Sequence, residues 1–110
     1  MLIEKNAGHH VSRALVALAA GDTERARQHI DRCRTLIRDP HDPALARITK
    51  WGHLYLKGRR YRESEMWLLA AEKIIERFPE YKLDEEREWL HPSHLLNRLR
   101  TEMNDGNVAR

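Results

Sequence analysis

Seven histidines are the residues of this sequence most able to do chemistry. His9 and His10 are adjacent, and His91 and His94 are three residues apart, a spacing that can bring two metal ligands together on a helix. Pro92 interrupts the second pair, and no carboxylate follows in the H-E-x-x-H pattern of zinc proteases. The pattern favours histidines that lie on the surface or cap helices, and we expect no metal site.

The carboxylates are densest in the segment DEEREW, residues 84–89. General acid–base catalysis needs two carboxyl groups that converge on a pocket, one with a shifted pKa. Adjacent carboxylates at a helix start point in different directions and stabilise the helix dipole. No serine lies in a G-x-S-x-G motif, and the five glycines are isolated, so no phosphate-binding loop is present. We predict that the chain is not an enzyme and uses no cofactor.

A single cysteine, Cys33, excludes an intramolecular disulfide framework and a zinc site built from several cysteines. A free cysteine on a helix is typically a small buried apolar residue. The first ten residues lack the apolar core of a signal peptide, and the longest apolar run, 14–20, is far shorter than the roughly 20 residues that cross a bilayer. We therefore expect a cytoplasmic protein with no membrane partner.

The charge is unevenly distributed along the chain. Residues 1–62 hold 13 Lys and Arg against 6 Asp and Glu, a net charge of +7, whereas residues 63–110 hold 7 against 11, a net charge of −4. The densest basic cluster is Lys57, Arg59, Arg60 and Arg62. A basic half favours an acidic partner, either nucleic acid or protein. The opposite signs of the two halves also allow head-to-tail association into a homodimer.

The apolar periodicity predicts an all-α fold, a small bundle of about five to six helices with no strand. The expected helices span about 9–20, 23–38, 43–56 and 61–78, followed by a short acidic helix capped by Asp84 and a last helix from Pro92 or Ser93 to Met103. The first four would pair as hairpins over 9–38 and 43–78, with C-terminal helices over 84–103. We expect one domain over 1–103 and a flexible tail over 104–110.

Glycine, aspartate and proline mark the expected helix ends. Gly21 would close the first helix, Asp22 or Thr23 would cap the second, and Asp42 followed by proline would start the third. Gly52 lies inside a helix, where it costs about 1 kcal/mol relative to alanine, so a neighbouring helix should approach it closely. The helix over 61–78 carries two adjacent apolar stripes, which predicts packing on two sides.

The segment 48–71 resembles a tetratricopeptide repeat, because Gly52, Tyr55, Tyr61 and Ala71 stand at four of that family's characteristic spacings. The first hairpin matches less well. Gly21 lies 37 residues before Gly58, at what would be the equivalent turn, and Ala26 also fits the pattern. Ala14 and Ala17, however, stand where the family has a glycine and a tyrosine. Ser64 replaces the usual alanine, and the closing proline comes late, at Pro79. The resemblance implies stacked helix hairpins that present a groove to another protein.

A second resemblance rests on the stretch YRESEMWLLAA, residues 61–71. Trp67 follows Tyr61 by a few residues, which is similar to small bacterial and phage regulators of the ANR and PerC type. Their motif places small residues and then a tryptophan after a Gly-x-Tyr turn, and here Ser64 and Glu65 occupy the small-residue positions. This likeness implies a small regulatory protein.

The function expected from the sequence is binding to another protein through a helical groove, in a small bacterial or phage accessory protein that regulates or inhibits its partner. The alternative is a nucleic-acid-binding regulator that uses the basic half. The expected partner-binding residues are Trp51, Tyr55, Arg59, Arg60, Arg62, Met66 and Trp67. Contacts to phosphates or to an acidic partner are expected from Arg25, Arg32, Arg34, Arg47, Lys50 and Lys57. Together with Arg59, Arg60 and Arg62, these residues could form one stripe.

Overall fold

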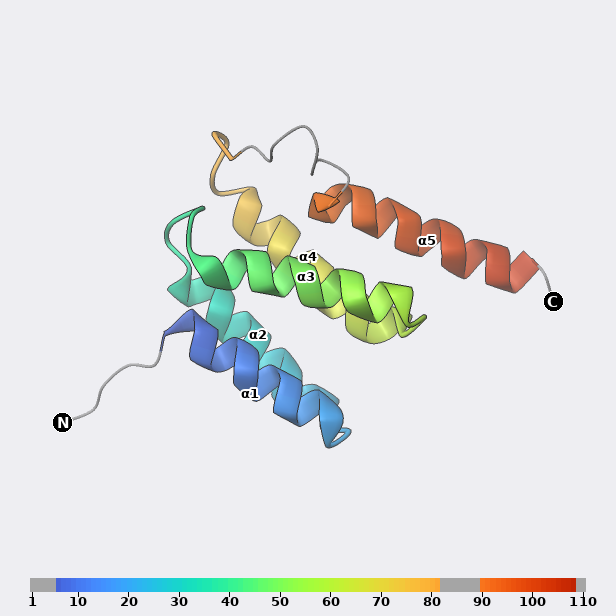
Figure 1. The fold of residues 1–110 in the computed structure, drawn as a ribbon, viewed down its shortest axis with the longest axis horizontal. Helices are drawn as coiled ribbons and strands as arrows, with labels where there is room; N and C mark the ends of the chain where they lie inside the picture. The colour runs from blue at the N-terminus through green and yellow to red at the C-terminus, as the bar shows by residue number, and fades with distance from the viewer. Residues whose placement is uncertain (1–5, 82–89, 109–110) are drawn as a thin grey trace.

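The computed structural model describes residues 6–81 and 90–108, and this part of the chain contains five helices and no strand (Figure 1). The helices are α1 (Ala7–Ala19), α2 (Thr23–Leu36), α3 (Pro43–Lys57), α4 (Tyr61–Ile75) and α5 (Pro92–Val108). The predicted all-α fold is confirmed. None of these helices is both long enough and apolar enough to cross a bilayer.

The first four helices form two antiparallel hairpins, α1–α2 and α3–α4 (Figure 1). The hairpins stack so that α1 lies against α3 and α2 lies against α4. The last helix packs along α4 and touches α3 on the side away from the first hairpin. Helix α4 therefore contacts α2, α3 and α5 and is the central element of the fold.

The capping residues explain where the helices begin. The Asp22 carboxylate accepts a hydrogen bond from the backbone N–H of Arg25 (3.1 Å), and the Asp42 carboxylate accepts one from Ala44 (2.9 Å). Both satisfy amide groups that the first turn of a helix leaves without partners. Helix α1 begins two residues earlier than expected, because the Asn6 side chain caps it by accepting from His9 (2.9 Å).

Three helix ends differ from the expectation. Helix α2 ends at Leu36 rather than at Arg38, and α4 ends at Ile75 rather than at Phe78. The Arg77 guanidinium donates to the backbone carbonyls of Arg34 (2.7 Å) and Ile37 (2.9 Å), where α2 ends. Helix α5 continues to Val108, so residues 104–108, expected in the flexible tail, are helical. The short helix expected after Asp84 falls within 82–89, outside the described residues.

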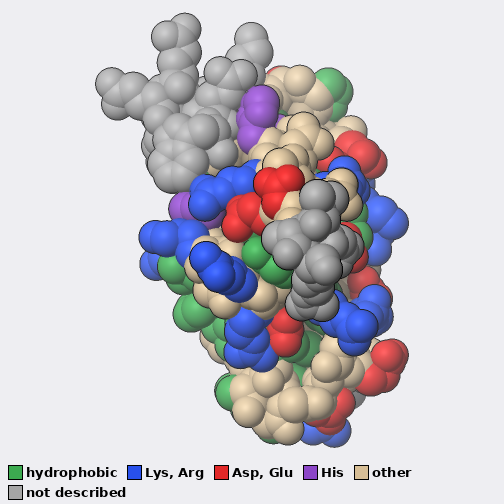
Figure 2. All heavy atoms as spheres, turned by 90° about the vertical axis from the view of Figure 1, so that its right-hand side faces the viewer, with side chains coloured by type: hydrophobic (Ala, Val, Ile, Leu, Met, Phe, Trp, Pro, Cys, Tyr) green, Lys and Arg blue, Asp and Glu red, His purple; other side chains and the backbone are tan. Residues whose placement is uncertain are grey.

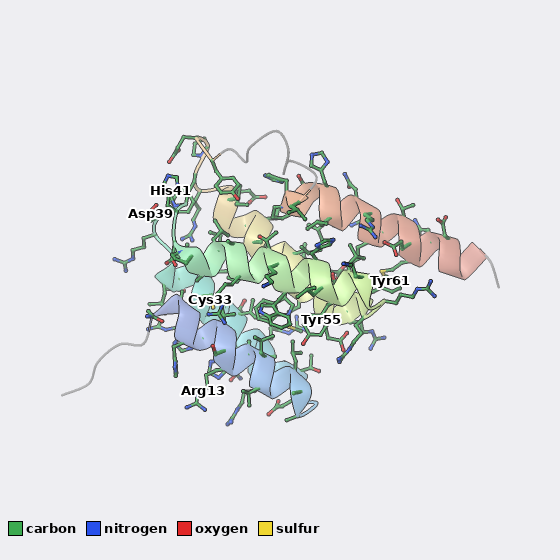
Figure 3. The ribbon with its side chains drawn as sticks, viewed as in Figure 1. Arg13, Cys33, Asp39, His41, Tyr55 and Tyr61 are labelled. Carbon is green, nitrogen blue, oxygen red and sulfur yellow. The ribbon has the colours of Figure 1, made fainter. Side chains whose placement is uncertain are left out.

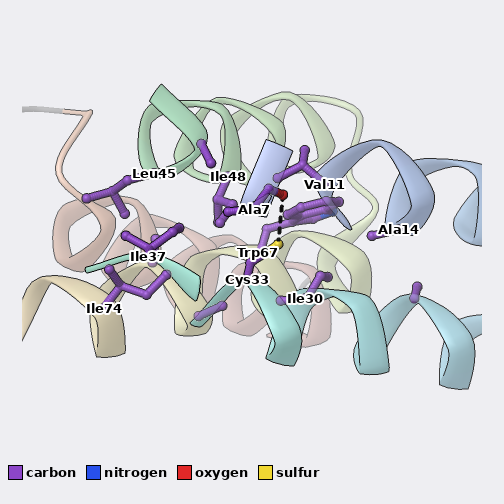
Figure 4. Close-up of a cluster of buried hydrophobic side chains, with 14 of the residues drawn as sticks. Ala7, Val11, Ala14, Ile30, Cys33, Ile37, Leu45, Ile48, Trp67 and Ile74 are labelled. Carbon is purple, nitrogen blue, oxygen red and sulfur yellow. Dashed lines mark hydrogen bonds between the residues drawn. The ribbon is translucent and has the colours of Figure 1, made fainter. Parts of the chain in front are cut away.

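The two apolar stripes of α4 face two separate clusters of buried side chains. One cluster joins Trp67, Ala71 and Ile74 of α4 to apolar residues of α1, α2 and α3 (Figure 4). The other joins Leu68 to Leu56 of α3 and to three leucines of α5, Leu95, Leu96 and Leu99. The prediction that α4 packs on two sides is therefore confirmed.

Cys33 lies in the first cluster and is fully buried, as expected. Its thiol donates to the backbone carbonyl of Ala7 (3.4 Å), a contact drawn in Figure 4. Burial raises the pKa of the Cys33 thiol to about 12. The thiol consequently stays protonated near neutral pH and is a poor nucleophile.

Gly52 marks the point of closest approach within the second hairpin. A Cβ atom at this position would lie 2.6 Å from Leu68 Cδ2 and 3.3 Å from Trp67 Cβ. The buried hydroxyl of Ser64 donates to the Gly52 carbonyl across the same crossing (2.7 Å). The predicted close approach is confirmed, and Ser64 adds a hydrogen bond between α3 and α4 that alanine could not make.

The two hairpin turns have the same backbone geometry, but the expectation that Gly58 occupies the position equivalent to Gly21 is wrong. In the first turn Gly21 has a φ of 77°, and the N–H groups of Gly21 and Asp22 bond back to the carbonyls of Leu18 and Ala17. In the second turn Arg59 has the positive φ, 60°, and Arg59 and Arg60 bond back to Leu56 and Tyr55. Gly58 has a φ of −82°, which any residue adopts. The position equivalent to Gly21 is thus Arg59, 38 residues later.

We expect Arg59→Gly to stabilise the protein by about 1 kcal/mol, because only glycine adopts a positive φ without a steric penalty. A thermal melt should show a midpoint a few degrees higher. Arg59→Ala is the matched control, since it removes the charge but keeps the strained backbone, and it should leave the midpoint nearly unchanged. Equal stabilisation by both variants would instead assign the effect to the charge.

Candidate protein-binding surface

A concave surface lies between α2 and α4. Two adjoining cavities occupy it, with volumes of about 470 Å³ and 210 Å³, and they share Asp31, Arg34 and Lys73 as lining residues. The smaller one has an apolar floor of Ile30, Met66, Leu69 and Ala70, whereas Thr35, Ile74 and Arg77 line the larger one. We call this surface the α2–α4 groove.

One face of α4 forms a wall of this groove. Met66, Leu69 and Lys73 follow one another at intervals of three or four residues, so they share one face of α4, and Arg62 precedes them at the same spacing. Arg77, in the turn that follows the end of α4, lines the larger cavity beside Lys73. Met66 and Leu69 are half-buried, whereas Arg62, Lys73 and Arg77 are exposed. Of these five, sequence reasoning had selected only Arg62 and Met66. The helical spacing from Arg62 to Lys73 was the signal that could have found Leu69 and Lys73.

The groove is bordered by more positive than negative charge. On the α2 wall, Arg27 pairs with Glu24 (4.0 Å) and Arg34 pairs with Asp31 (3.5 Å). On the α4 wall, neither Lys73 nor Arg62 has an ion pair with any residue in the described ranges. Lys73 and Arg62 are therefore the charges that a partner could neutralise.

The α3–α4 turn holds part of the basic cluster in internal contacts. The Arg60 guanidinium lies 5.2 Å from the centre of the Tyr55 ring and donates to the Glu63 carboxylate at 2.8 Å. Burial alone would raise the pKa of Glu63, but a backbone hydrogen bond and the bond from Arg60 hold it below its usual value. Arg60 therefore stabilises the turn, whereas Lys57, Arg59 and Arg62 are exposed around it.

The expected aromatic anchors do not share one surface. Trp67 is fully buried, with 0% of its area exposed, so its assignment to the partner-binding set is wrong. Trp51 and Tyr55 are half-buried neighbours on α3 with ring centres 6.2 Å apart, and Tyr55 lies on the α1 side of the second hairpin (Figure 3). Met66 lies in the α2–α4 groove instead. The predicted binding residues thus divide among the core, the α1–α3 side, the turn and the groove.

The expected basic stripe is not formed, because its members lie in different places. Arg25 lines a cleft of α1 and α2, and Lys50 lines a cavity beside α3. Arg47 also lines that cavity, and it donates to the Gly8 carbonyl (3.3 Å) and to the Ser12 hydroxyl (3.4 Å) of α1. Figure 2 shows Lys and Arg side chains scattered among acidic and uncharged ones at the end of the molecule that carries the α3–α4 turn. Arg32 is exposed on α2, and of the predicted members only Arg34 belongs to the groove.

Several of the histidines lie close together in pairs. The Nδ1 atoms of His10 and His29 are 3.0 Å apart, within hydrogen-bonding distance, and the His91 and His94 rings are 6.1 Å apart. Among residues 6–81 and 90–108, no three His, Cys, Asp or Glu side chains are grouped closely enough to hold a metal ion. The His10–His29 pair joins α1 to α2 and was not anticipated from the sequence.

Two histidines should make the stability of the protein depend on pH. Burial, with the nearby Arg13 and Arg25, lowers the pKa of His29 below its usual 6.5, and burial with Lys57 and Arg98 does the same for His53. Below about pH 6.5 the unfolded chain consequently binds more protons than the folded protein. The free energy of unfolding should therefore keep its full value above about pH 6.5 and decrease as the pH falls below it.

Urea titrations at pH 7.5, 6.5 and 5.5 measure this effect. The double variant His29→Gln/His53→Gln should flatten the profile across this window, since carboxylates titrate mostly below it. A free energy of unfolding that stays constant or increases on acidification would contradict the prediction.

No model of a known protein family matches the chain, and comparisons with curated proteins and with solved structures find no match either. The resemblance to tetratricopeptide repeats and the likeness to ANR and PerC regulators therefore stay predictions. The assignment of function rests on the geometry of the groove.

Proposed function

We propose that this protein acts by binding another protein, which lies in the α2–α4 groove, and that it carries out no chemical reaction. The observation that carries the proposal is the groove itself: two adjoining cavities between parallel-stacked hairpins, with an apolar floor and charged walls. Half-buried Met66 and Leu69 would supply the apolar contact area, and the arginines and Lys73 would orient the partner.

The form of the fold supports this function. Two stacked helix hairpins hold the walls of the groove through the buried cluster around Trp67, so the surface is preformed and a partner would not have to order it. Regulation or inhibition of the partner by occupying one of its surfaces is the role that such a module would serve.

Partner capture from cells with groove variants tests the proposal. Met66→Ser and Lys73→Glu should each abolish or strongly reduce the recovery of a specific partner by immobilised protein. Arg13→Glu is the matched control, because Arg13 is an exposed arginine on α1 that lines neither cavity of the groove, and recovery should persist. Unchanged capture by the groove variants would rule out the groove, and DNA or RNA retardation abolished by Lys73→Glu would favour nucleic-acid binding instead.

A further inference from the structure

The charges on the α4 wall follow a simple order along the groove. Met66, Leu69 and Lys73 line the smaller cavity in that order. Arg62 lines neither cavity, but it is exposed one turn before Met66, and the helical spacing puts it on the same face of α4, just beyond the end of the cavity. Arg62 and Lys73 are 11 residues apart, which corresponds to about 16 Å along a helix. A ligand that neutralises both must place two negative charges about three helical turns apart, with an apolar surface between them.

The α2 wall of the groove adds positive charge as well. Arg27 and Arg34 on α2 are each partly neutralised by a carboxylate of the preceding turn, and Asp31 is the one acid that both cavities share. Beyond Lys73, Arg77 adds a further positive charge, although it also donates to the carbonyls at the end of α2. The lining of the two cavities thus carries four cations, Arg27, Arg34, Lys73 and Arg77, against one acid, Asp31.

On the basis of the function proposed above, we infer that the occupant of the groove is an amphipathic α-helix of another protein, with an apolar anchor flanked on both sides by carboxylates. Its apolar side chains would cover Met66 and Leu69, and its two acidic clusters would lie against Arg62 and against Lys73. The complementarity is both apolar and electrostatic, so neither property alone should give full affinity.

A helix fits this surface better than the other occupants of a groove. The walls are the outer faces of two α-helices, which offer side chains and no backbone edge, so an extended strand would leave its own amide groups without partners. A nucleic acid presents its negative charges continuously, and its phosphates would face the apolar middle of the groove. A helix presents charge and apolar surface in alternation, which matches the order on α4.

The test uses three synthetic helical peptides and the full-length protein. The acidic peptide carries leucines on one face and two glutamate clusters about 11 residues apart. A second peptide replaces the glutamates by lysines and keeps the leucines, and a third keeps the glutamates and replaces the leucines by serines. Fluorescence anisotropy measures binding of each peptide to the unmodified protein and to Met66→Ser, Arg62→Glu, Lys73→Glu and Arg13→Glu.

We expect the acidic leucine peptide to bind at least about tenfold more tightly than either other peptide. Arg62→Glu and Lys73→Glu should each weaken it by about tenfold, and Met66→Ser should weaken it with no change in salt dependence, whereas Arg13→Glu should have no effect. Melting curves of the variants establish that each still folds, so that lost affinity reports the surface.

The opposite results have distinct meanings. Equal binding of the lysine peptide, or binding of the acidic peptide that none of the groove variants alters, overturns the inference. If no peptide binds but the groove variants still lose a captured partner, the occupant is not an acidic amphipathic helix, and the proposed function stands. Absence of both peptide binding and groove-dependent capture overturns the proposed function as well. Dimerisation in light scattering that Lys73→Glu abolishes would identify a second copy as the occupant and would likewise overturn the inference.

Discussion

Trp67→Ala should lower the free energy of unfolding by about 3–5 kcal/mol, a large part of the total stability of a small domain. The indole is fully buried and packs among side chains of α1, α2 and α3, so its removal leaves a cavity that three helices border (Figure 4). Urea denaturation followed by circular dichroism measures the loss. A variant that retains nearly full stability would show that the two hairpins do not depend on this contact.

Trp67→Phe is the informative control. The indole N–H is the one buried side-chain donor in the described part of the chain that has no hydrogen-bond partner. Leaving a buried donor unpaired costs about 1–3 kcal/mol, and phenylalanine removes that penalty while it keeps most of the apolar volume. Trp67→Phe should therefore cost less than half as much as Trp67→Ala. Equal losses would indicate that the N–H does bind a partner, such as a buried water.

Gly52→Ala should lower the free energy of unfolding by about 2 kcal/mol or more, although alanine favours a helix by about 1 kcal/mol over glycine. The added Cβ would lie 2.7 Å from Leu68 Cγ, and Leu68 is fully buried among Leu56 and the leucines of α5, so a shift of its side chain would disturb that cluster. Relief by separation of the helices would lengthen the Ser64 hydrogen bond to the Gly52 carbonyl. The denaturation midpoint in urea reports the change.

A glycine in the same hairpin serves as the matched control. Gly58 has an ordinary φ of −82°, and a Cβ there would meet only backbone oxygens at 3.6 and 3.7 Å, so Gly58→Ala should be neutral or slightly stabilising. Shortening the neighbour should also rescue the defect: Leu68→Ala should cost less in the Gly52→Ala background than in the native one. Additive losses would show that the two positions do not clash.

The helices were predictable because they depend on chemistry that is local in the chain. Asp22 and Asp42 cap helices through bonds to amides two or three residues away, and the apolar periodicity of 61–75 is a property of that segment alone. Gly52 predicted a close crossing of two helices, because glycine is unfavourable inside a helix and no local feature of the sequence explains it there. The ends of α2 and α4 were misplaced where Arg77 reaches across to the carbonyls at the end of α2, a contact between segments distant in the chain. The start of α1 was misplaced although its cap, Asn6, is local.

The candidate site was only partly predictable, because exposure is decided by neighbours that are far away in the sequence. Met66 and Trp67 are adjacent, yet one borders the α2–α4 groove and the other is buried. Each residue of a helix is rotated by about 100° from the last, so adjacent side chains face different surroundings. Which side chains of α4 are buried depends on how α2 and α5 cross that helix.

By itself the sequence determined the all-α class, the pairing of helices by short turns, the two-sided packing of α4 and the close approach at Gly52. Only the tertiary structure decided that Arg59 carries the strained turn, that the basic residues are dispersed, and that Met66, Leu69 and Lys73 line a shared surface with α2. Helix formation and capping act over a few residues, whereas a binding surface exists only when segments distant in the chain leave the same side uncovered.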